Sequence, residues 1–255
     1  MFSLKSSIFI LIVSIIGIIG FNTTVSGNHS WGSYHWARTA NPFTLKLGDN
    51  ITTAWDNYLV TTSNDWSLSS ALDTAIVSGS VNAKTCKATL GRANVCNSKY
   101  GSNGWLGVAS IWATGSHITQ GTVKLNDTYF STAKYNTSAW RNLVMCQEVG
   151  HIFGLDHQDE NFSNPPLGTC MDYSNDPIPN QHPNQHDYDQ LATIYTHLDS
   201  TTTTSQTVSG LPNNNASDSA EWGTALRKDS KGRTSLYVRD LGNNEKVFTF
   251  VLWAD

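Results

Sequence analysis

The residues from Gln147 to His157 have the types and the spacing that a metal-dependent hydrolytic site needs. In a helix, Gln147 and His151 lie one turn apart on the same face, with the carboxylate of Glu148 beside them. Gly154 permits a sharp turn or a left-handed backbone, which returns His157 toward that face. Three potential ligands and one carboxylate then converge. Such a set can hold a metal-activated water, which requires three protein ligands, one open position and a general base.

This stretch resembles the zinc-binding signature of the metzincin metalloproteases, His-Glu-x-x-His-x-x-Gly-x-x-His. Gln147 stands where the family has its first histidine, and the remaining positions match in order: Glu148, His151, Gly154 and His157. The resemblance implies that His151 and His157, with or without Gln147, bind Zn2+. It also implies that Glu148 is the general base.

A second segment resembles the Met-turn of the same family. Met171 corresponds to the methionine beneath the metal, and Tyr173 to the tyrosine that in some metzincins binds zinc or the tetrahedral intermediate. In the implied mechanism, zinc lowers the pKa of a bound water, and Glu148 takes its proton as the water attacks a peptide carbonyl. Tyr173 donates to the developing oxyanion. The implied function is a zinc-dependent endopeptidase that acts on a protein or peptide substrate.

Gln147 leaves three outcomes open, because an amide oxygen is a neutral and harder donor than imidazole. Gln147 binds zinc through its side-chain oxygen, a water or another residue takes its place, or the site holds no metal. His182 and His186 are candidate replacement ligands, with solvated positions near a helix start as the alternative. A site without metal would make the chain a catalytically inactive secreted binding protein that retains the protease fold. A carbohydrate-binding protein that uses its many tryptophans is a third class.

Residues 1–27 have the pattern of a secretory signal peptide: Lys5, an apolar run and then small residues. The apolar run is short for a membrane span of about 20 residues. We therefore expect a secreted, extracellular protein without stable membrane association after signal cleavage. The net charge of −4 favours no nucleic-acid partner. The oligomeric state is not indicated by the sequence.

The four cysteines predict two disulfides in an oxidising compartment, with three pairings open. We favour Cys86 with Cys96, which closes a local loop. The other bridge then joins Cys146 to Cys170, and so attaches the residue before Gln147 to the start of the Met-turn.

Alternation and helical spacing predict an α+β fold with a twisted mixed sheet, an active-site helix, a Met-turn and a C-terminal helix. The expected strands cover residues 43–47, 72–77, 105–112 and 118–125, and the expected helices cover 49–72, 139 onward with Ser138 as cap, and 186–198. Residues 84–104 are expected to form a loop.

The element order resembles that of a metzincin catalytic domain, assigned to residues 28–198. A Thr/Ser-rich linker follows at 199–210. Residues 211–255 form a small β unit, with strands at 234–238 and 246–253 and a third near 225.

The same resemblance makes residues 107–116 a candidate substrate-binding edge, because in metzincins the strand before the zinc helix pairs with extended substrate. A plain strand inside the sheet is the alternative. His117 and His197 have no partner at a metal-ligand spacing, so we interpret both as surface or packing residues.

Overall fold

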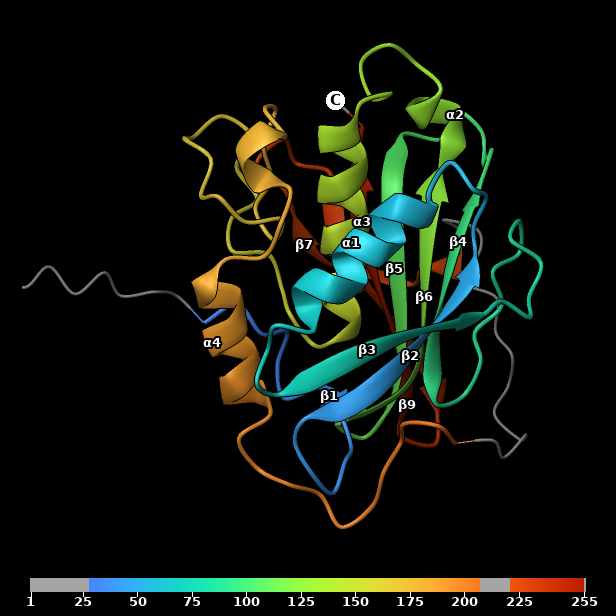
Figure 1. Cartoon of the computed structure of the whole chain (residues 1–255), viewed down its shortest axis with the longest axis vertical. Coiled ribbons are helices and arrows are strands. Elements are labelled where there is room, and N and C mark those ends of the chain that lie inside the picture. The colour runs from blue at the N-terminus through green and yellow to red at the C-terminus, as the bar shows by residue number, and fades with distance from the viewer. Residues whose placement is uncertain (1–27, 207–220, 255) are drawn as a thin grey trace, which may run out of the picture.

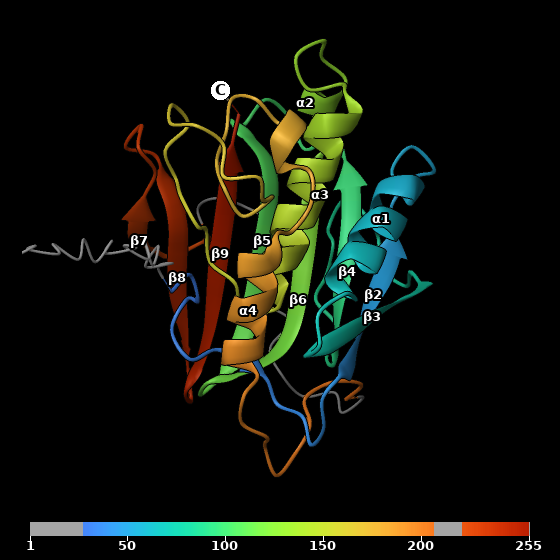
Figure 2. The same ribbon diagram turned by 60° about the vertical axis from the view of Figure 1, so that its left-hand side comes forward.

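A nine-stranded mixed sheet carries helices α1, α3 and α4 on one face (Figures 1 and 2). The structure is a computed structural model and describes residues 28–206 and 221–254, so the predicted signal peptide lies outside the described residues. The strands are β1 (His35–Trp36), β2 (Phe43–Asn50), β3 (Leu72–Ser78), β4 (Arg92–Ser98), β5 (Trp105–Thr114), β6 (His117–Asn126), β7 (Thr224–Lys228), β8 (Thr234–Gly242) and β9 (Glu245–Trp253). The helices are α1 (Asp56–Trp66), α2 (Asp127–Phe130), α3 (Ser138–Ile152) and α4 (Gln185–Ile194), with a 3-10 turn η1 (Ile178–Asn180).

The strand order is β3-β2-β4-β6-β5-β9-β8-β7, with β1 paired to β6. β2, β3, β4 and β6 run parallel, whereas β5 runs antiparallel to both β6 and β9. β8 and β7 continue the antiparallel part. The predicted mixed α+β sheet is therefore present, and the C-terminal strands extend the sheet of the preceding domain.

Most predicted elements are present, with several differences. β1 and α2 were not predicted, and α4 ends at Ile194 rather than at 198. β4 lies inside the segment expected to be a loop. Its interior residues are all buried, and polar Asn94 and Asn97 lie among them, so no alternating pattern marks this strand. The first helix is shorter than expected, because α1 begins at Asp56 and ends at Trp66.

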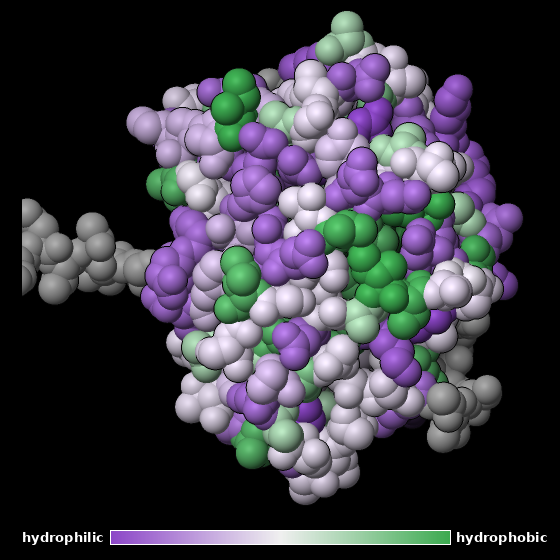
Figure 3. Space-filling view, viewed as in Figure 1, coloured by the Kyte–Doolittle hydropathy of each residue, from purple (hydrophilic) through white to green (hydrophobic). Residues whose placement is uncertain are grey.

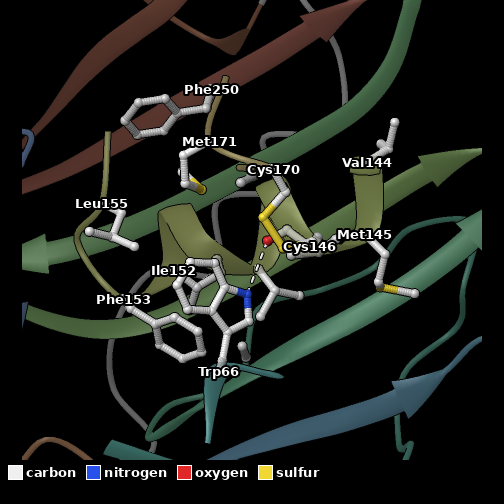
Figure 4. Packing of buried hydrophobic residues seen from close by; sticks show 14 of the residues in the cluster. Trp66, Val144, Met145, Cys146, Ile152, Phe153, Leu155, Cys170, Met171 and Phe250 are labelled. Carbon is white, nitrogen blue, oxygen red and sulfur yellow. Dashed lines mark hydrogen bonds between the residues drawn. A yellow bond between two sulfur atoms is a disulfide. The ribbon is translucent and has the colours of Figure 1, made fainter. Parts of the chain in front are cut away.

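Large aromatic side chains form much of the core between the helices and the sheet. Trp66 of α1 donates from Nε1 to the backbone oxygen of Cys146 in α3 (3.2 Å), as Figure 4 shows. All tryptophans in the described residues except Trp253 are buried. The sugar-binding alternative therefore lacks the exposed tryptophan surface on which it depended.

Apolar side chains gather on the surface over α1 and the neighbouring edge of the sheet (Figure 3). Val60 and Ile76 belong to these elements and are partly exposed. Among the residues that the structure describes, no helix is long and apolar enough to cross a membrane.

Candidate active site

Helix α3 carries the motif and packs against β5 and β6. The hydroxyl of Thr137 accepts a hydrogen bond from the backbone N–H of Trp140 (3.2 Å), so the cap lies one residue before the predicted Ser138. Gly107 of β5 allows the close approach of α3, because a Cβ there would lie 2.4 Å from Glu148 Oε1. The motif face of α3 therefore lies directly on the sheet.

Gly154 makes the turn that the sequence predicts. Its φ of +97° is left-handed, and its N–H donates to the backbone oxygen of His151 (3.1 Å). The chain returns so that the Nε2 atoms of His151 and His157 lie 2.9 Å apart, with the two rings nearly perpendicular. The two predicted histidine ligands are thus brought together.

Hydrogen bonds determine which nitrogen of each ring carries the proton. His151 Nδ1 lies 2.8 Å from the backbone oxygen of Leu155, and His157 Nδ1 lies 2.6 Å from Glu160 Oε1. Because carbonyl and carboxylate oxygens accept, both Nδ1 atoms donate. In the neutral rings the two Nε2 atoms therefore point lone pairs at each other. That contact is favourable only with a proton or a metal ion between them.

Burial disfavours a proton between the two Nε2 atoms, because it penalises the charged form of each ring. It lowers the pKa of His157 to about 3, with the positive charge of Arg227 acting in the same direction. Burial also lowers the pKa of His151 well below its ordinary value, and His157 adds to the effect. Burial thus disfavours a second proton on either ring, and the paired Nε2 atoms are suited to bind a metal ion.

Gln147 and Glu148 precede His151 on α3, and both have buried polar atoms without hydrogen-bond partners in the part of the chain that the structure describes. Both side chains are completely buried, and within the described residues neither amide atom of Gln147 has a hydrogen-bond partner. The carboxylate of Glu148 makes no hydrogen bond of normal geometry. Burial raises its pKa well above the ordinary value, although the nearby backbone N–H of Ala109 opposes this. Buried polar atoms without partners are costly, so these two side chains are candidates to bind a metal ion or a water molecule.

The predicted Met-turn packs against α3, with Met171 close to the Cys146–Cys170 disulfide (Figure 4). A Cβ at Gly150 would lie 2.5 Å from Met171 Sδ, so the methionine contacts the helix backbone itself. The two disulfides join Cys146 to Cys170 and Cys86 to Cys96, which is the pairing that the sequence favours.

Strand β9 covers the site from the C-terminal side of the chain. Phe250 lies face to face on His151, with ring centroids 4.0 Å apart. Tyr173 donates its hydroxyl to the backbone oxygen of Val251 (3.1 Å), and burial raises its pKa, so it remains a donor. The hydroxyl predicted to contact the reacting carbonyl is therefore engaged with β9.

Arg227 of β7, another C-terminal strand, forms ion pairs with two carboxylates next to His157. Its Nη1 donates to Asp156 Oδ2 (2.5 Å), and its Nε lies 2.9 Å from Glu160 Oε1. Glu160 in turn orients His157 through Nδ1. The ion pairs thus connect the C-terminal strands to the carboxylate that orients the predicted metal ligand His157.

The predicted substrate edge at residues 107–116 is not free, which corrects that expectation. β5 hydrogen-bonds along its length with β9, from Trp105 opposite Trp253 to Thr114 opposite Glu245. The physical reason is that an open edge strand presents unpaired backbone groups, and here a later strand of the same chain satisfies them.

The two candidate replacement ligands are occupied elsewhere. His182 Nδ1 lies 2.7 Å from Asp65 Oδ2 and its side chain is exposed. His186 stacks on His29.

Four residues that contact the predicted site were not predicted: Asp156, Glu160, Arg227 and Phe250. Asp156 and Glu160 have a local signal, because they lie one residue before and three residues after His157. The two C-terminal residues reach the site only through sheet pairing.

No protein-family model and no curated protein matches the chain. Among solved structures it is similar to high choriolytic enzyme 1, a hatching enzyme zinc-protease from the medaka fish Oryzias latipes. The two chains are 11% identical with a TM-score of 0.36, and the match covers 65% of this chain and 96% of the other. At this level the likeness carries no argument, and the site assignment rests on the residues of this chain.

Proposed function

We propose that the chain is a secreted zinc-dependent endopeptidase whose site is closed by its own C-terminal strands. The observation that carries the proposal is the buried pair of Nε2 lone pairs on His151 and His157, which face each other at 2.9 Å. Two disulfides fit the oxidising compartment that secretion implies.

His151 and His157 would hold the zinc ion, with the unpartnered amide oxygen of Gln147 as the third protein ligand. Zinc bound there would supply a nucleophile at neutral pH by lowering the pKa of a water molecule. The Glu160 carboxylate fixes the ring orientation of His157, and the Leu155 carbonyl does the same for His151. Such outer contacts also raise the basicity of the ligands.

Glu148 would act as the general base, one turn along α3 from His151. It would take the proton of the attacking water and pass it to the leaving amine. Burial raises its pKa in the closed, metal-free site, so the ionised form that acts as a base would be favoured by opening of the site or by a cation beside it. The Tyr173 hydroxyl would stabilise the oxyanion after it leaves the backbone oxygen of Val251.

Catalysis by this site requires β9 to move. Glu148 is completely buried, and β9 occupies the edge of β5 that an extended peptide would need. A substrate strand would therefore replace β9 beside β5 and place its scissile bond near His151, where Phe250 now lies.

One observation favours a second candidate function, an inactive secreted binding protein that retains a closed metal site. The completely buried position of Gln147 and Glu148 under the C-terminal strands leaves no room for a substrate in this conformation. This alternative predicts bound zinc but no hydrolysis, even in a variant in which Phe250 no longer covers His151.

Hydrolysis of an unfolded protein by the purified full chain tests the proposal. Wild type, Glu148→Gln and the cover variant Phe250→Ala are compared, each with zinc and after chelation. Cleavage that needs zinc and is lost in Glu148→Gln supports the peptidase. Zinc retention without cleavage in both wild type and Phe250→Ala overturns it in favour of the closed binding protein.

A further inference from the structure

A second cluster of metal-type ligands lies away from α3, where β1, the start of β6 and the segment after α4 meet. His35 and His117 are register partners in the parallel pair of β1 and β6. His197 and Asp199 follow α4 and reach the same point. We propose that His35, His117, His197 and Asp199 form a four-ligand site for a divalent transition-metal ion such as zinc.

The distances between the ligand atoms carry this proposal. Asp199 Oδ1 lies 3.4 Å from His35 Nε2, 3.2 Å from His117 Nε2 and 3.7 Å from His197 Nε2. The Nε2 atoms of His35 and His197 lie 3.1 Å apart. Tetrahedral zinc with bonds of roughly 2.0–2.1 Å requires ligand atoms about 3.3 Å from one another. These four of the six separations fall around that value. The ligand atoms of His35, His117 and Asp199 all lie within 4.8 Å of one another. The exposed His197 side chain would turn toward His117 to complete the set.

A hydrogen bond outside the cluster orients the ring of His35, so that its Nε2 lone pair points into the cluster. His35 Nδ1 lies 2.7 Å from the backbone oxygen of Ser33, so Nδ1 donates and Nε2 of the neutral ring is an acceptor. That Nε2 nevertheless faces the Asp199 carboxylate and a second imidazole nitrogen. Neutral His117 and His197 can carry their proton on Nδ1, which leaves each Nε2 lone pair free to bind a cation beside Asp199 Oδ1. With the proton on Nε2 instead, the same atoms would form ordinary hydrogen bonds, and zinc binding distinguishes the two arrangements.

Asp199 is oriented from outside the cluster. Its Oδ2 accepts hydrogen bonds from Arg38 Nη1 (3.0 Å) and from the Arg38 backbone N–H (3.2 Å). Oδ1 is therefore left to face the three histidines. Arg38 and the Ser33 carbonyl have the positions of outer-shell groups, which fix ligand geometry at metal sites.

The donor set indicates the class of ion and the role of the site. Three imidazoles and one carboxylate suit zinc and similar ions rather than magnesium or calcium, which prefer oxygen ligands. Four protein ligands without an open position are typical of a structural site. The ion would join the N-terminal segment to the sheet and to the chain after α4, and its binding energy would add to the stability of the fold.

The main competing explanation is a proton in place of the metal ion, with one histidine charged beside Asp199. Such a pair would stabilise the cluster in acid and bind no zinc. Titration of metal-free protein with zinc separates the two explanations.

The experiment starts from the full chain carrying His151→Ala and His157→Ala, so that zinc at α3 does not contribute. After dialysis with zinc, elemental analysis should give about one ion per chain. Adding His117→Ala and His197→Ala should remove that ion. Both of these side chains are partly exposed, so the fold should survive, and circular dichroism checks this. Adding His182→Ala instead is the matched control, because this histidine is exposed and pairs with Asp65 outside the cluster.

A cobalt spectrum and a rescue variant complete the test. Co2+ should give the intense visible absorption of a tetrahedral site in the α3-deficient chain, and His197→Asp should retain it because the carboxylate remains a ligand. Losing one ligand should weaken zinc binding by at least roughly 10–100-fold, the loss typical of an outer-shell change. A zinc content and a zinc-induced rise in Tm that are the same with and without His117 and His197 would overturn the proposal. Because α3 is disabled throughout, this result is independent of the proposed peptidase function.

Discussion

Phe250 lies flat on His151, with the two rings inclined by 11° and their centroids 4.0 Å apart. Phe250 of the last strand, β9, thus covers His151, a predicted metal ligand that lies on α3. The contact links sheet pairing at β5 to the accessibility of the motif.

Phe250→Ala should uncover His151 and raise the rate of peptide cleavage per folded molecule. The free energy of unfolding should fall by about 3–5 kcal/mol, as is typical for a buried phenylalanine. Cleavage of a short peptide and urea unfolding measure the two effects. Phe248→Ala is the matched control, since Phe248 lies on the same strand but packs on Trp31 and Tyr34. Equal cleavage by both variants would contradict a gating role for Phe250.

Glu148→Gln should abolish cleavage while stabilising the metal-free fold at neutral pH. Burial raises the pKa of Glu148 in the folded state, so the folded chain retains a proton that the unfolded chain releases above about pH 4.5. Stability supplied by the protonated form is therefore lost as pH rises. The Tm difference between Glu148→Gln and wild type should grow from pH 4.5 to 7 in chelated samples. A difference that does not change over this range would contradict the burial argument.

Gln147→His should strengthen zinc binding at α3 by at least roughly tenfold, because imidazole is a better zinc ligand than a neutral amide. Competition with a chromophoric chelator measures the affinity. Gln147→Leu tests whether the amide is a ligand at all: it should weaken binding if the side-chain oxygen coordinates. Identical affinities for Leu and Gln would mean that another group fills the third position.

Acid should destabilise the fold, because the pKa values of His151 and His157 are lowered by burial. Below about pH 6.5 the histidines of the unfolded chain bind protons, whereas the two buried rings of the folded chain do not. The free energy of unfolding is therefore highest above this pH. It falls as the pH drops toward about 3, the pKa of folded His157. Urea midpoints from pH 7 to 4 should show the decline. His157→Gln should flatten it, whereas the exposed control His182→Gln should not.

Removing the Cys146–Cys170 bridge by a double change to serine should cost about 3.5 kcal/mol, the chain-entropy value for a loop of this length. It should also weaken zinc binding, because the bridge attaches α3 to the Met-turn. The Cys86–Cys96 bridge is the control, since it closes a separate loop. Its removal should cost a comparable amount of stability and leave zinc affinity at α3 unchanged.

Local pattern was sufficient for the parts of the site that lie close together in the chain. One helical turn separates Gln147 from His151, and Gly154 can adopt the left-handed turn that returns His157. The hairpin of β8 and β9 was also predicted, because alternation and turn residues are local signals. β4 was missed because it is buried on both faces and does not alternate.

The sequence by itself determined the donor groups of the motif and their spacing, and it favoured the disulfide pairing that the structure shows. Only the tertiary structure decided that β9 occupies the edge of β5, that Phe250 covers His151 and that His35 meets Asp199. The physical reason is that these contacts join residues far apart in the chain. Which strand pairs with an open edge depends on packing of the whole core, and no local periodicity encodes it.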